Sequence, residues 1–274
     1  MAVRLVRIGK IEIGAGQPLA VIAGPCVIES RESALRHAAL LKEAADRAGV
    51  PYIFKASYDK ANRSSVDSYR GPGLQRGLEI LAEVRRKIAV PVLTDVHEKE
   101  QVGPAQEVAD VLQIPAFLCR QTDFVIAVAR AGKVVNIKKG QFLSPWEMGN
   151  VVQKILSTGN DRILLTERGA SFGYNNLVSD MRSLVVMREL GYPVVFDATH
   201  SLQLPGGLGK ASGGERKYIG ALARAAAAVG VDALFMEVHE DPDRALSDGP
   251  NSLPLNQFEA LLRTVKEIDA ILKR

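Results

Sequence analysis

The sequence has few of the features that define several other classes of protein. It contains only two cysteines, Cys26 and Cys119, among 274 residues, which excludes a disulfide-stapled scaffold and favours a reducing compartment. No apolar run approaches the roughly 18 residues that a membrane-spanning helix needs, and the first residues lack the apolar stretch of a signal peptide. We therefore expect a cytoplasmic protein that is neither exported nor embedded in a membrane.

The sequence also lacks a large excess of charge of one sign. The chain carries 35 Lys and Arg against 31 Asp and Glu, a formal net charge of +4. That excess is too small and too dispersed to form a stripe for nucleic acid or for a membrane surface, so we expect neither partner. A composition of 47% hydrophobic and 24% charged residues also excludes a disordered chain. Small anionic molecules suit this balance better.

Short runs of apolar and β-branched residues recur along the chain and alternate with segments of helical period. Helical spacing is clearest over residues 74–88 and 258–272. Near-continuous apolar strands indicate burial on both faces, and eight such units predict an α/β fold with one closed (β/α)8 TIM barrel. No linker divides the chain, so we predict a single domain over residues 1–274, with a β-hairpin in residues 1–14 capping the N-terminal mouth. The predicted strands span residues 19–25, 52–57, 90–96, 111–116, 134–138, 162–166, 193–198 and 233–238.

Polar side chains follow every predicted strand, at the end of the barrel where this fold builds its active site. Any single one indicates little, because loops are solvated in all barrels. Several of them are cations at depths where an unpaired charge is costly, and the acids nearby are too few to pair with all of them. A ligand with several negative charges, such as phosphates and a carboxylate, would supply the missing partners. The residues are Cys26, Lys55, Lys60, Arg63, Asp95, His97, Gln113, Arg120, Lys138, Glu167, Arg168, Asp197, His200, Glu237 and His239.

Residues 60–65 read Lys-Ala-Asn-Arg-Ser-Ser and combine a cation, a guanidinium, an amide and two hydroxyls. These groups suit the oxygens of a phosphate monoester, although a solvated loop is the alternative. Two glycine-containing segments, residues 171–176 and 210–215, are expected to be mobile loops that close over a substrate.

Cys26, His200, Glu237 and Asp248 have no metal-ligand spacing in the sequence. In a closed eight-strand ring, however, the first, seventh and eighth strands are neighbours, so these side chains should converge. A thiolate, an imidazole and two carboxylates suit a divalent ion such as zinc, iron or manganese. The alternative is a cysteine that only packs in the core.

The motifs at these strand ends resemble those of the 3-deoxy-D-manno-octulosonate 8-phosphate synthase family, in the same order, from about residue 19 to the C-terminus. The resemblance implies condensation of phosphoenolpyruvate with D-arabinose 5-phosphate and water, which yields an eight-carbon sugar acid phosphate and inorganic phosphate for lipopolysaccharide synthesis. It also implies a barrel that assembles as a homotetramer. The matching segments are residues 24–30, 54–57, 60–65, 69–73, 94–97, 113–116, 120–123, 136–138, 168–170, 196–200 and 247–250.

The same resemblance assigns roles to residues of this chain. His200, Asp95, Asp248 and Lys138 would be catalytic. We separately expect that loss of Lys138 abolishes turnover and leaves the fold intact, because no structural partner would be left with an unpaired charge. Arabinose 5-phosphate would be held by Lys60, Asn62, Arg63 and Ser64, with Arg63 reaching in from a neighbouring subunit. Phosphoenolpyruvate would be held by Lys55, Gln113, Arg120, Lys138 and Arg168.

Family members that need a divalent metal carry cysteine where this chain has Cys26, whereas metal-free members carry asparagine. The resemblance therefore implies a metal-dependent enzyme with Cys26, His200, Glu237 and Asp248 as ligands, and residues 201–207 also resemble that group. The nearest rival is the related 3-deoxy-heptulosonate phosphate synthase, which uses erythrose 4-phosphate and carries Lys-Pro-Arg-Thr where this chain reads Lys-Ala-Asn-Arg. A Schiff-base aldolase using Lys55 or Lys138 and a non-catalytic sugar-phosphate sensor are further alternatives.

Overall fold

The computed structural model describes residues 3–63, 65–206 and 213–273. Eight parallel strands form a closed ring, because the last of them, β14, pairs with both β11 and the first strand, β3. The predicted (β/α)8 barrel is therefore confirmed. The ring strands are β3 (Ala20–Gly24), β4 (Tyr52–Lys55), β5 (Val92–Asp95), β6 (Val111–Ile114), β7 (Val134–Lys138), β8 (Ile163–Glu167), β11 (Val194–Asp197) and β14 (Ala233–His239).

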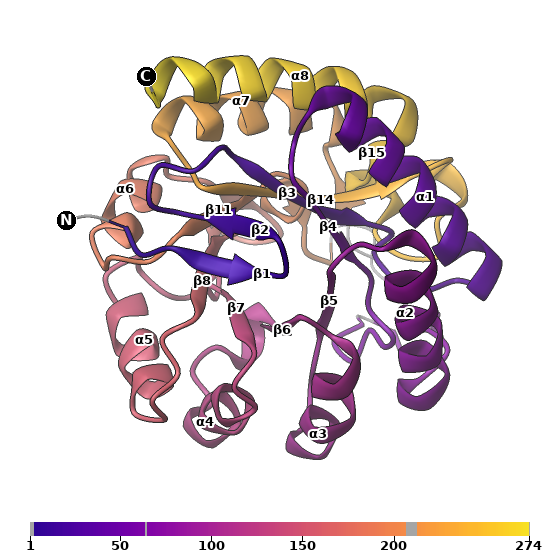
Figure 1. Cartoon of the computed structure of the whole chain (residues 1–274), viewed down its shortest axis with the longest axis horizontal. Helices are drawn as coiled ribbons and strands as arrows, with labels where there is room; N and C mark the ends of the chain where they lie inside the picture. The colour runs from indigo at the N-terminus through magenta and orange to yellow at the C-terminus, as the bar shows by residue number, and fades with distance from the viewer. Residues whose placement is uncertain (1–2, 64, 207–212, 274) are drawn as a thin grey trace.

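Helices surround the ring and cover its outer face (Figure 1). The helices predicted from residues 74–88 and 258–272 are present, because their apolar residues recur at intervals of three and four and face the strands. The helices are α1 (Arg31–Ala48), α2 (Leu74–Ile88), α3 (Lys99–Val108), α4 (Thr122–Arg130), α5 (Met148–Leu156), α6 (Arg182–Arg188), α7 (Ile219–Val229) and α8 (Leu255–Leu272). None of the helices that the structure describes is long and apolar enough to cross a bilayer.

The strands are buried on both faces, as their continuous apolar runs predicted. One set of strand residues packs outward against the helices. The alternate set fills the barrel interior, because successive side chains of a strand point to opposite faces. Ile22, Ile53, Leu93, Val111 and Phe235 belong to this inner set. The barrel is thus a packed core and leaves room for a ligand only at its ends.

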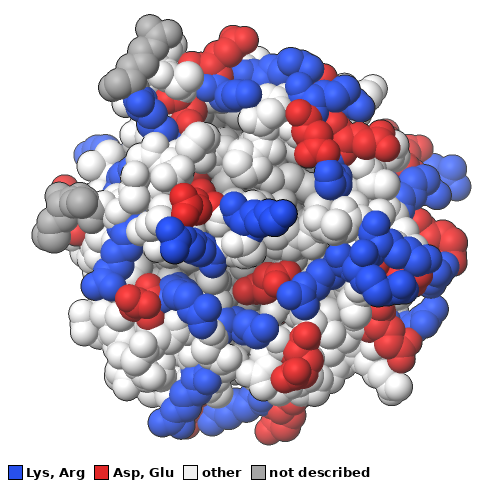
Figure 2. All heavy atoms as spheres, in the orientation of Figure 1, with Lys and Arg blue, Asp and Glu red and all other residues white. Residues whose placement is uncertain are grey.

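The N-terminal hairpin consists of β1 (Val6–Ile8) and β2 (Ile11–Ile13), joined through Gly9 in a left-handed conformation. The hairpin lies over the N-terminal end of the barrel (Figure 1), and its apolar side chains, Val6, Ile8 and Ile13, belong to the inner core cluster and close that end. Figure 2 shows this face with basic and acidic side chains interspersed, as the dispersed charge of the sequence predicted.

Several short strands and 3-10 turns lie at the opposite, C-terminal end of the barrel. Residues 171–176, expected to be a mobile loop, lie mostly in the turn of a small hairpin between β9 (Ala170–Ser171) and β10 (Leu177–Val178), and their mobility stays a prediction. A second pair, β12 (Gln203–Leu204) and β13 (Gly213–Gly214), holds the segment after β11. Residues 210–212 of the other expected loop lie outside the described residues. The remaining pieces are β15 (Leu253–Pro254) and the 3-10 turns η1 (Ala116–Leu118), η2 (His200–Leu202), η3 (Arg216–Tyr218), η4 (Pro242–Arg244) and η5 (Gly249–Asn251).

Candidate active site and metal centre

Side chains from the C-terminal ends of the strands surround a cavity of about 180 Å³. Most of the residues predicted from the strand ends and from the family motifs line this cavity. They lie together because the C-terminal ends of all parallel strands in a closed ring meet at the same end of the barrel. His97, which the strand-end prediction included without a specific role, also lines the cavity, as do Gln141 and Gln203, which the prediction did not assign. The predicted lining residues are Lys55, Lys60, Asn62, Arg63, Asp95, Gln113, Lys138, Arg168, His200 and Asp248.

Among the described residues, one predicted substrate ligand, Arg120, is not found in this cavity. The side chain of Arg120 is exposed and lines a neighbouring depression beyond His97, because the η1 turn carries the chain outward after β6. Ser64 lies outside the described residues. Arg63 reaches the cavity of its own chain, where its guanidinium donates to Ser247 Oγ at 2.8 Å.

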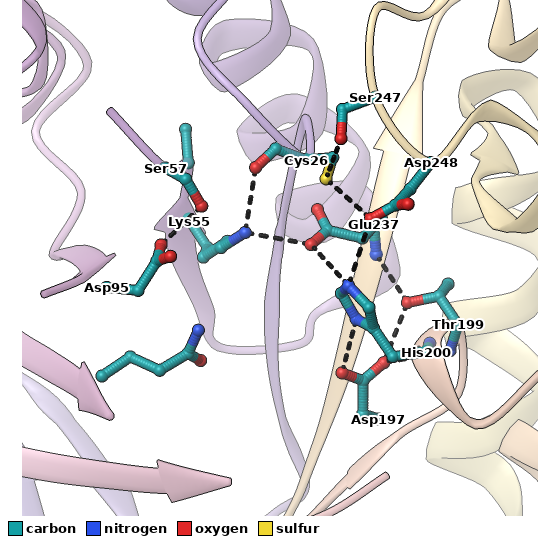
Figure 3. Close-up of polar contacts among 12 residues, drawn as sticks. Cys26, Lys55, Ser57, Asp95, Asp197, Thr199, His200, Glu237, Ser247 and Asp248 are labelled. Carbon is teal, nitrogen blue, oxygen red and sulfur yellow. Dashed lines mark hydrogen bonds and ion pairs between the residues drawn. The ribbon is translucent and has the colours of Figure 1, made fainter. Parts of the chain in front are cut away.

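Cys26, His200 and Asp248 offer ligand atoms that all lie within 4.8 Å of one another (Figure 3). The Cys26 sulfur is 3.1 Å from Asp248 Oδ2, and His200 Nε2 is 3.5 Å from the same oxygen. The predicted convergence of these strand ends is confirmed, and the described part of the chain contains a group that can hold a metal ion. Its soft sulfur and harder nitrogen and oxygen atoms suit a borderline divalent ion.

Glu237, the fourth predicted ligand, lies beside this group. Its Oε1 accepts a hydrogen bond from Lys55 Nζ at 2.9 Å and lies 3.6 Å from His200 Nε2 (Figure 3). Its Oε2 is buried and has no hydrogen-bond partner among the described residues. A buried, unpaired carboxylate oxygen is costly, and a cation placed between Glu237 and the other three side chains would remove that cost. The donor set and this orphaned oxygen therefore fit a metal ion.

The protonation states of the cluster follow from burial and charge. Burial and the neighbouring Asp248 carboxylate raise the pKa of the Cys26 thiol. Burial opposes ionisation of Asp248, but the hydrogen bond and charge of His200, with the charge of Lys60, outweigh it and lower the pKa of Asp248. The thiol consequently holds its proton and donates it to an ionised Asp248. Metal binding has to displace that proton.

Asp197 fixes the orientation of His200. Its Oδ2 lies 2.7 Å from His200 Nδ1, so Nε2 is the ring nitrogen that faces the metal group. Its Oδ1 accepts from the backbone N–H groups of Thr199 and His200 and from the Thr199 hydroxyl. A carboxylate behind a histidine ligand is the usual outer support of a metal site. Sequence reasoning missed this role, although the three-residue spacing from Asp197 to His200 was a usable signal.

Lys138 also has a structural partner, contrary to the expectation that it would have none. Its ammonium contacts Asp197 Oδ2, and both side chains are buried. Lys138 Nζ lies 3.6 Å from the centroid of the Phe235 ring, which adds a cation–π contact. Burial lowers the pKa of Lys138 in spite of the Asp197 charge. The expectation failed because the ends of β7 and β11 approach each other across the mouth of the barrel.

The remaining cations differ in their partners. Lys55 pairs with Glu237, as Lys138 does with Asp197, so these two cations have acidic partners within the chain. Burial opposes protonation of Lys60, but the charges of Asp95, Glu237 and Asp248 outweigh it and raise its pKa. Arg168 is buried, and its Nη1 has no partner among the described residues. Burial lowers the pKa of Arg168, which fits a site that an anionic ligand completes.

Asp95 forms the opposite wall of the cavity. It accepts from the Ser57 hydroxyl, and its Oδ2 lies 3.2 Å from His97 Nε2. Burial opposes ionisation of Asp95, but the His97 hydrogen bond and the Lys60 charge outweigh it and lower its pKa. Burial likewise opposes protonation of His97, yet Asp95 raises its pKa. The wall is therefore an ionised carboxylate held by a histidine whose pKa it raises, and the histidine is the member of this pair with a pKa nearer neutrality.

Comparison with known proteins places the chain in a family. A model of the DAHP synthetase I family matches residues 3–274. The chain belongs to the DAHP synthetase I family. Within this family it is 62% identical over 271 residues to the 2-dehydro-3-deoxyphosphooctonate aldolase of Geotalea uraniireducens, covering 99% of this chain and 100% of that protein. It is 60% identical over 270 residues to the protein of the same name from Geobacter sulfurreducens, covering 98% and 99%. That name denotes the synthase family that the motifs resemble, so the resemblance is confirmed.

Proposed function

We propose that this chain condenses phosphoenolpyruvate with D-arabinose 5-phosphate and water to give 3-deoxy-D-manno-octulosonate 8-phosphate and inorganic phosphate, a step of lipopolysaccharide biosynthesis. The observation that carries the proposal is the near-full-length identity to enzymes of that name. The cavity supports it independently, because Lys55, Lys60, Lys138 and Arg168 line one space beside a group that can hold a metal ion. Lys55 and Lys138 already pair with Glu237 and Asp197, and the phosphates and carboxylate of the substrates would add counter-charge beside Lys60 and Arg168.

Phosphoenolpyruvate would lie deepest, with its phosphate and carboxylate on Lys55, Lys138 and Arg168. Arg168 Nη1 is free among the described residues and would donate to one of these anionic groups. Lys60, Asn62 and Arg63 would hold arabinose 5-phosphate nearer the rim, and Ser64 follows them in the sequence. Gln113, whose Oε1 accepts from Asn136 at 2.9 Å, is fixed with its side chain at the cavity floor. Arg120 stays a prediction.

The chemistry requires placement of reactants and stabilisation of charge. Carbon C3 of phosphoenolpyruvate forms a bond to the sugar aldehyde carbon, whose oxygen takes up a proton. Water adds to C2, where positive charge has developed, and the C–O bond to phosphate then breaks. The Asp95–His97 pair would relay a proton, while His200 and Asp248 would orient the water. Lys138 would hold the phosphoenolpyruvate anion throughout.

We further propose that Cys26, His200 and Asp248 bind zinc, iron or manganese, with Glu237 as the fourth ligand. When bound, the ion would act as a Lewis acid and a template for water or the sugar aldehyde. The support for this proposal is the spacing of the three ligand atoms and the orphaned Glu237 oxygen.

A homotetramer is the proposed assembly. Large aromatic side chains are exposed in the segments after β6, β7 and β8, and exposed apolar patches of this kind mark interaction surfaces. A second copy of the chain would cover them, and sedimentation analysis tests this. Within one chain Arg63 already lines its own cavity, so a contribution of Arg63 from a neighbour is not needed to complete it. The exposed aromatic residues are Phe117, Phe142, Trp146, Phe172 and Tyr174.

One assay separates the proposed reaction from its rivals. The purified chain is incubated with phosphoenolpyruvate and either arabinose 5-phosphate or erythrose 4-phosphate, with and without chelator, and phosphate release is followed. We expect release with arabinose 5-phosphate and loss of release with chelator. Faster release with erythrose 4-phosphate would instead identify the heptulosonate enzyme. Borohydride trapping of a substrate on Lys55 or Lys138 would indicate Schiff-base chemistry, and tight binding without turnover would indicate a sensor.

A further inference from the structure

Gln203, on β12, lies between one predicted substrate ligand and one predicted metal ligand. Its Oε1 accepts from Arg168 Nη2 at 2.9 Å. Its Nε2 donates to Asp248 Oδ1 at 3.2 Å. A side-chain amide has one accepting end and one donating end, so the cation and the carboxylate each meet the complementary end. These two contacts fix the orientation of Gln203.

The amide keeps two buried opposite charges apart. Arg168 is 4% exposed and the Asp248 side chain is 11% exposed, so their attraction is weakly screened by water. A direct pair between them would use the guanidinium donors that an anionic substrate needs. It would also turn the Asp248 carboxylate away from Cys26 and His200. With Gln203 between them, Arg168 Nη1 stays without a partner among the described residues, and Asp248 Oδ2 faces the metal group.

We propose that Gln203 is a positioning residue that holds Arg168 toward phosphoenolpyruvate and Asp248 toward the metal ion, and so connects the two sites. This inference rests on the proposed function. It distinguishes Gln203 from Gln141, which lines the same cavity and whose Oε1 has no partner among the described residues. Two glutamines of one cavity therefore offer a matched comparison.

The test measures each ligand in the absence of the other. Phosphoenolpyruvate binding to the metal-stripped full chain is measured by calorimetry, and cobalt binding without substrate is measured from the absorption of the cysteine–cobalt bond. Gln203→Met keeps the length of the side chain and removes both hydrogen bonds. Because a hydrogen bond to a charged group is involved on each side, we expect both affinities to fall about tenfold or more. Gln203→Asn keeps the amide but shortens its reach, and it should give the same two losses.

Gln141→Met is the control for a change of glutamine in this cavity, and we expect its cobalt affinity to stay within about twofold of that of the natural chain. The proposal is overturned if either affinity is unchanged in both Gln203 variants, or if Gln141→Met loses as much cobalt affinity as they do. A natural chain that binds neither ligand would overturn the proposed function as well. Normal binding by the natural chain with unchanged Gln203 variants would overturn only the role of Gln203.

Discussion

Replacing Lys138 by methionine separates its expected role in catalysis from its role in stability. The substitution keeps the apolar stem and removes the charge that contacts Asp197, whose side chain is fully buried. Removing one partner of a buried ion pair typically costs about 3–5 kcal/mol. Asp197 would keep four other donors, namely the Thr199 hydroxyl, two backbone N–H groups and the His200 ring. We therefore expect a smaller loss, about 2–3 kcal/mol in the free energy of unfolding, together with loss of turnover.

The double variant Lys138→Met/Asp197→Asn tests the origin of that loss. Asparagine can still accept hydrogen bonds from Thr199 and from the His200 backbone, but it carries no charge that would be left unpaired. The free energy of unfolding of the double variant should therefore lie within about 1 kcal/mol of that of the natural chain. Turnover should stay absent. Urea unfolding followed by circular dichroism, at one protein concentration, gives the stabilities, and phosphate release gives the activity. A single Lys138 variant as stable as the natural chain would refute the buried-pair argument, and an active one would remove Lys138 from the site.

Three further predictions concern the substrates and the metal. Arg63→Ala should weaken the binding of arabinose 5-phosphate by about 1.5–3 kcal/mol and the binding of phosphoenolpyruvate far less, as measured by the KM of each substrate. Equal losses of binding for both substrates would count against Arg63 as a sugar-phosphate ligand. A chelator should abolish the activity of the natural chain and of Cys26→Ala, and zinc, iron or manganese should restore the activity of the natural chain only. Cys26→Asn should keep some activity in the presence of the chelator. Full activity of a natural chain shown by elemental analysis to be free of metal would exclude a metal requirement. Because burial raises the pKa of the Cys26 thiol, binding should release about one proton per ion and metal affinity should rise about tenfold per pH unit near neutrality; a pH-independent affinity would show that the thiol is not a ligand.

The barrel and the convergence of its strand ends were predictable, because the first follows from the hydrophobic pattern of each strand and the second from closure of the eight strands into a ring. Apolar runs buried on two faces specify parallel strands, and eight of them specify a ring. Once the ring is closed, Cys26 and His200 must be neighbours although 174 positions separate them (200 − 26). No ligand spacing in the sequence contained that information.

The pairing of side chains across the mouth was not predictable. Whether Lys138 meets Asp197 depends on how far two strand ends lean toward each other, which periodicity does not encode. Arg120 follows a 3-10 turn whose direction the residue types do not fix, and it leaves the cavity. Gln203 lies on the two-residue strand β12, which is too short for a strand period to appear in the sequence, so its bridge between two charges was visible only in three dimensions.

The hairpin that closes the N-terminal end of the barrel also limits the order in which two substrates can enter the cavity. With Val6, Ile8 and Ile13 packed into that end, the cavity has its mouth on the C-terminal face. Lys138 lies deep and is buried, whereas Asn62 is exposed at the rim. A sugar phosphate seated at the rim would therefore block the way to the floor. In the proposed reaction phosphoenolpyruvate would then have to enter before arabinose 5-phosphate, because the described cavity offers the deeper substrate no second way in.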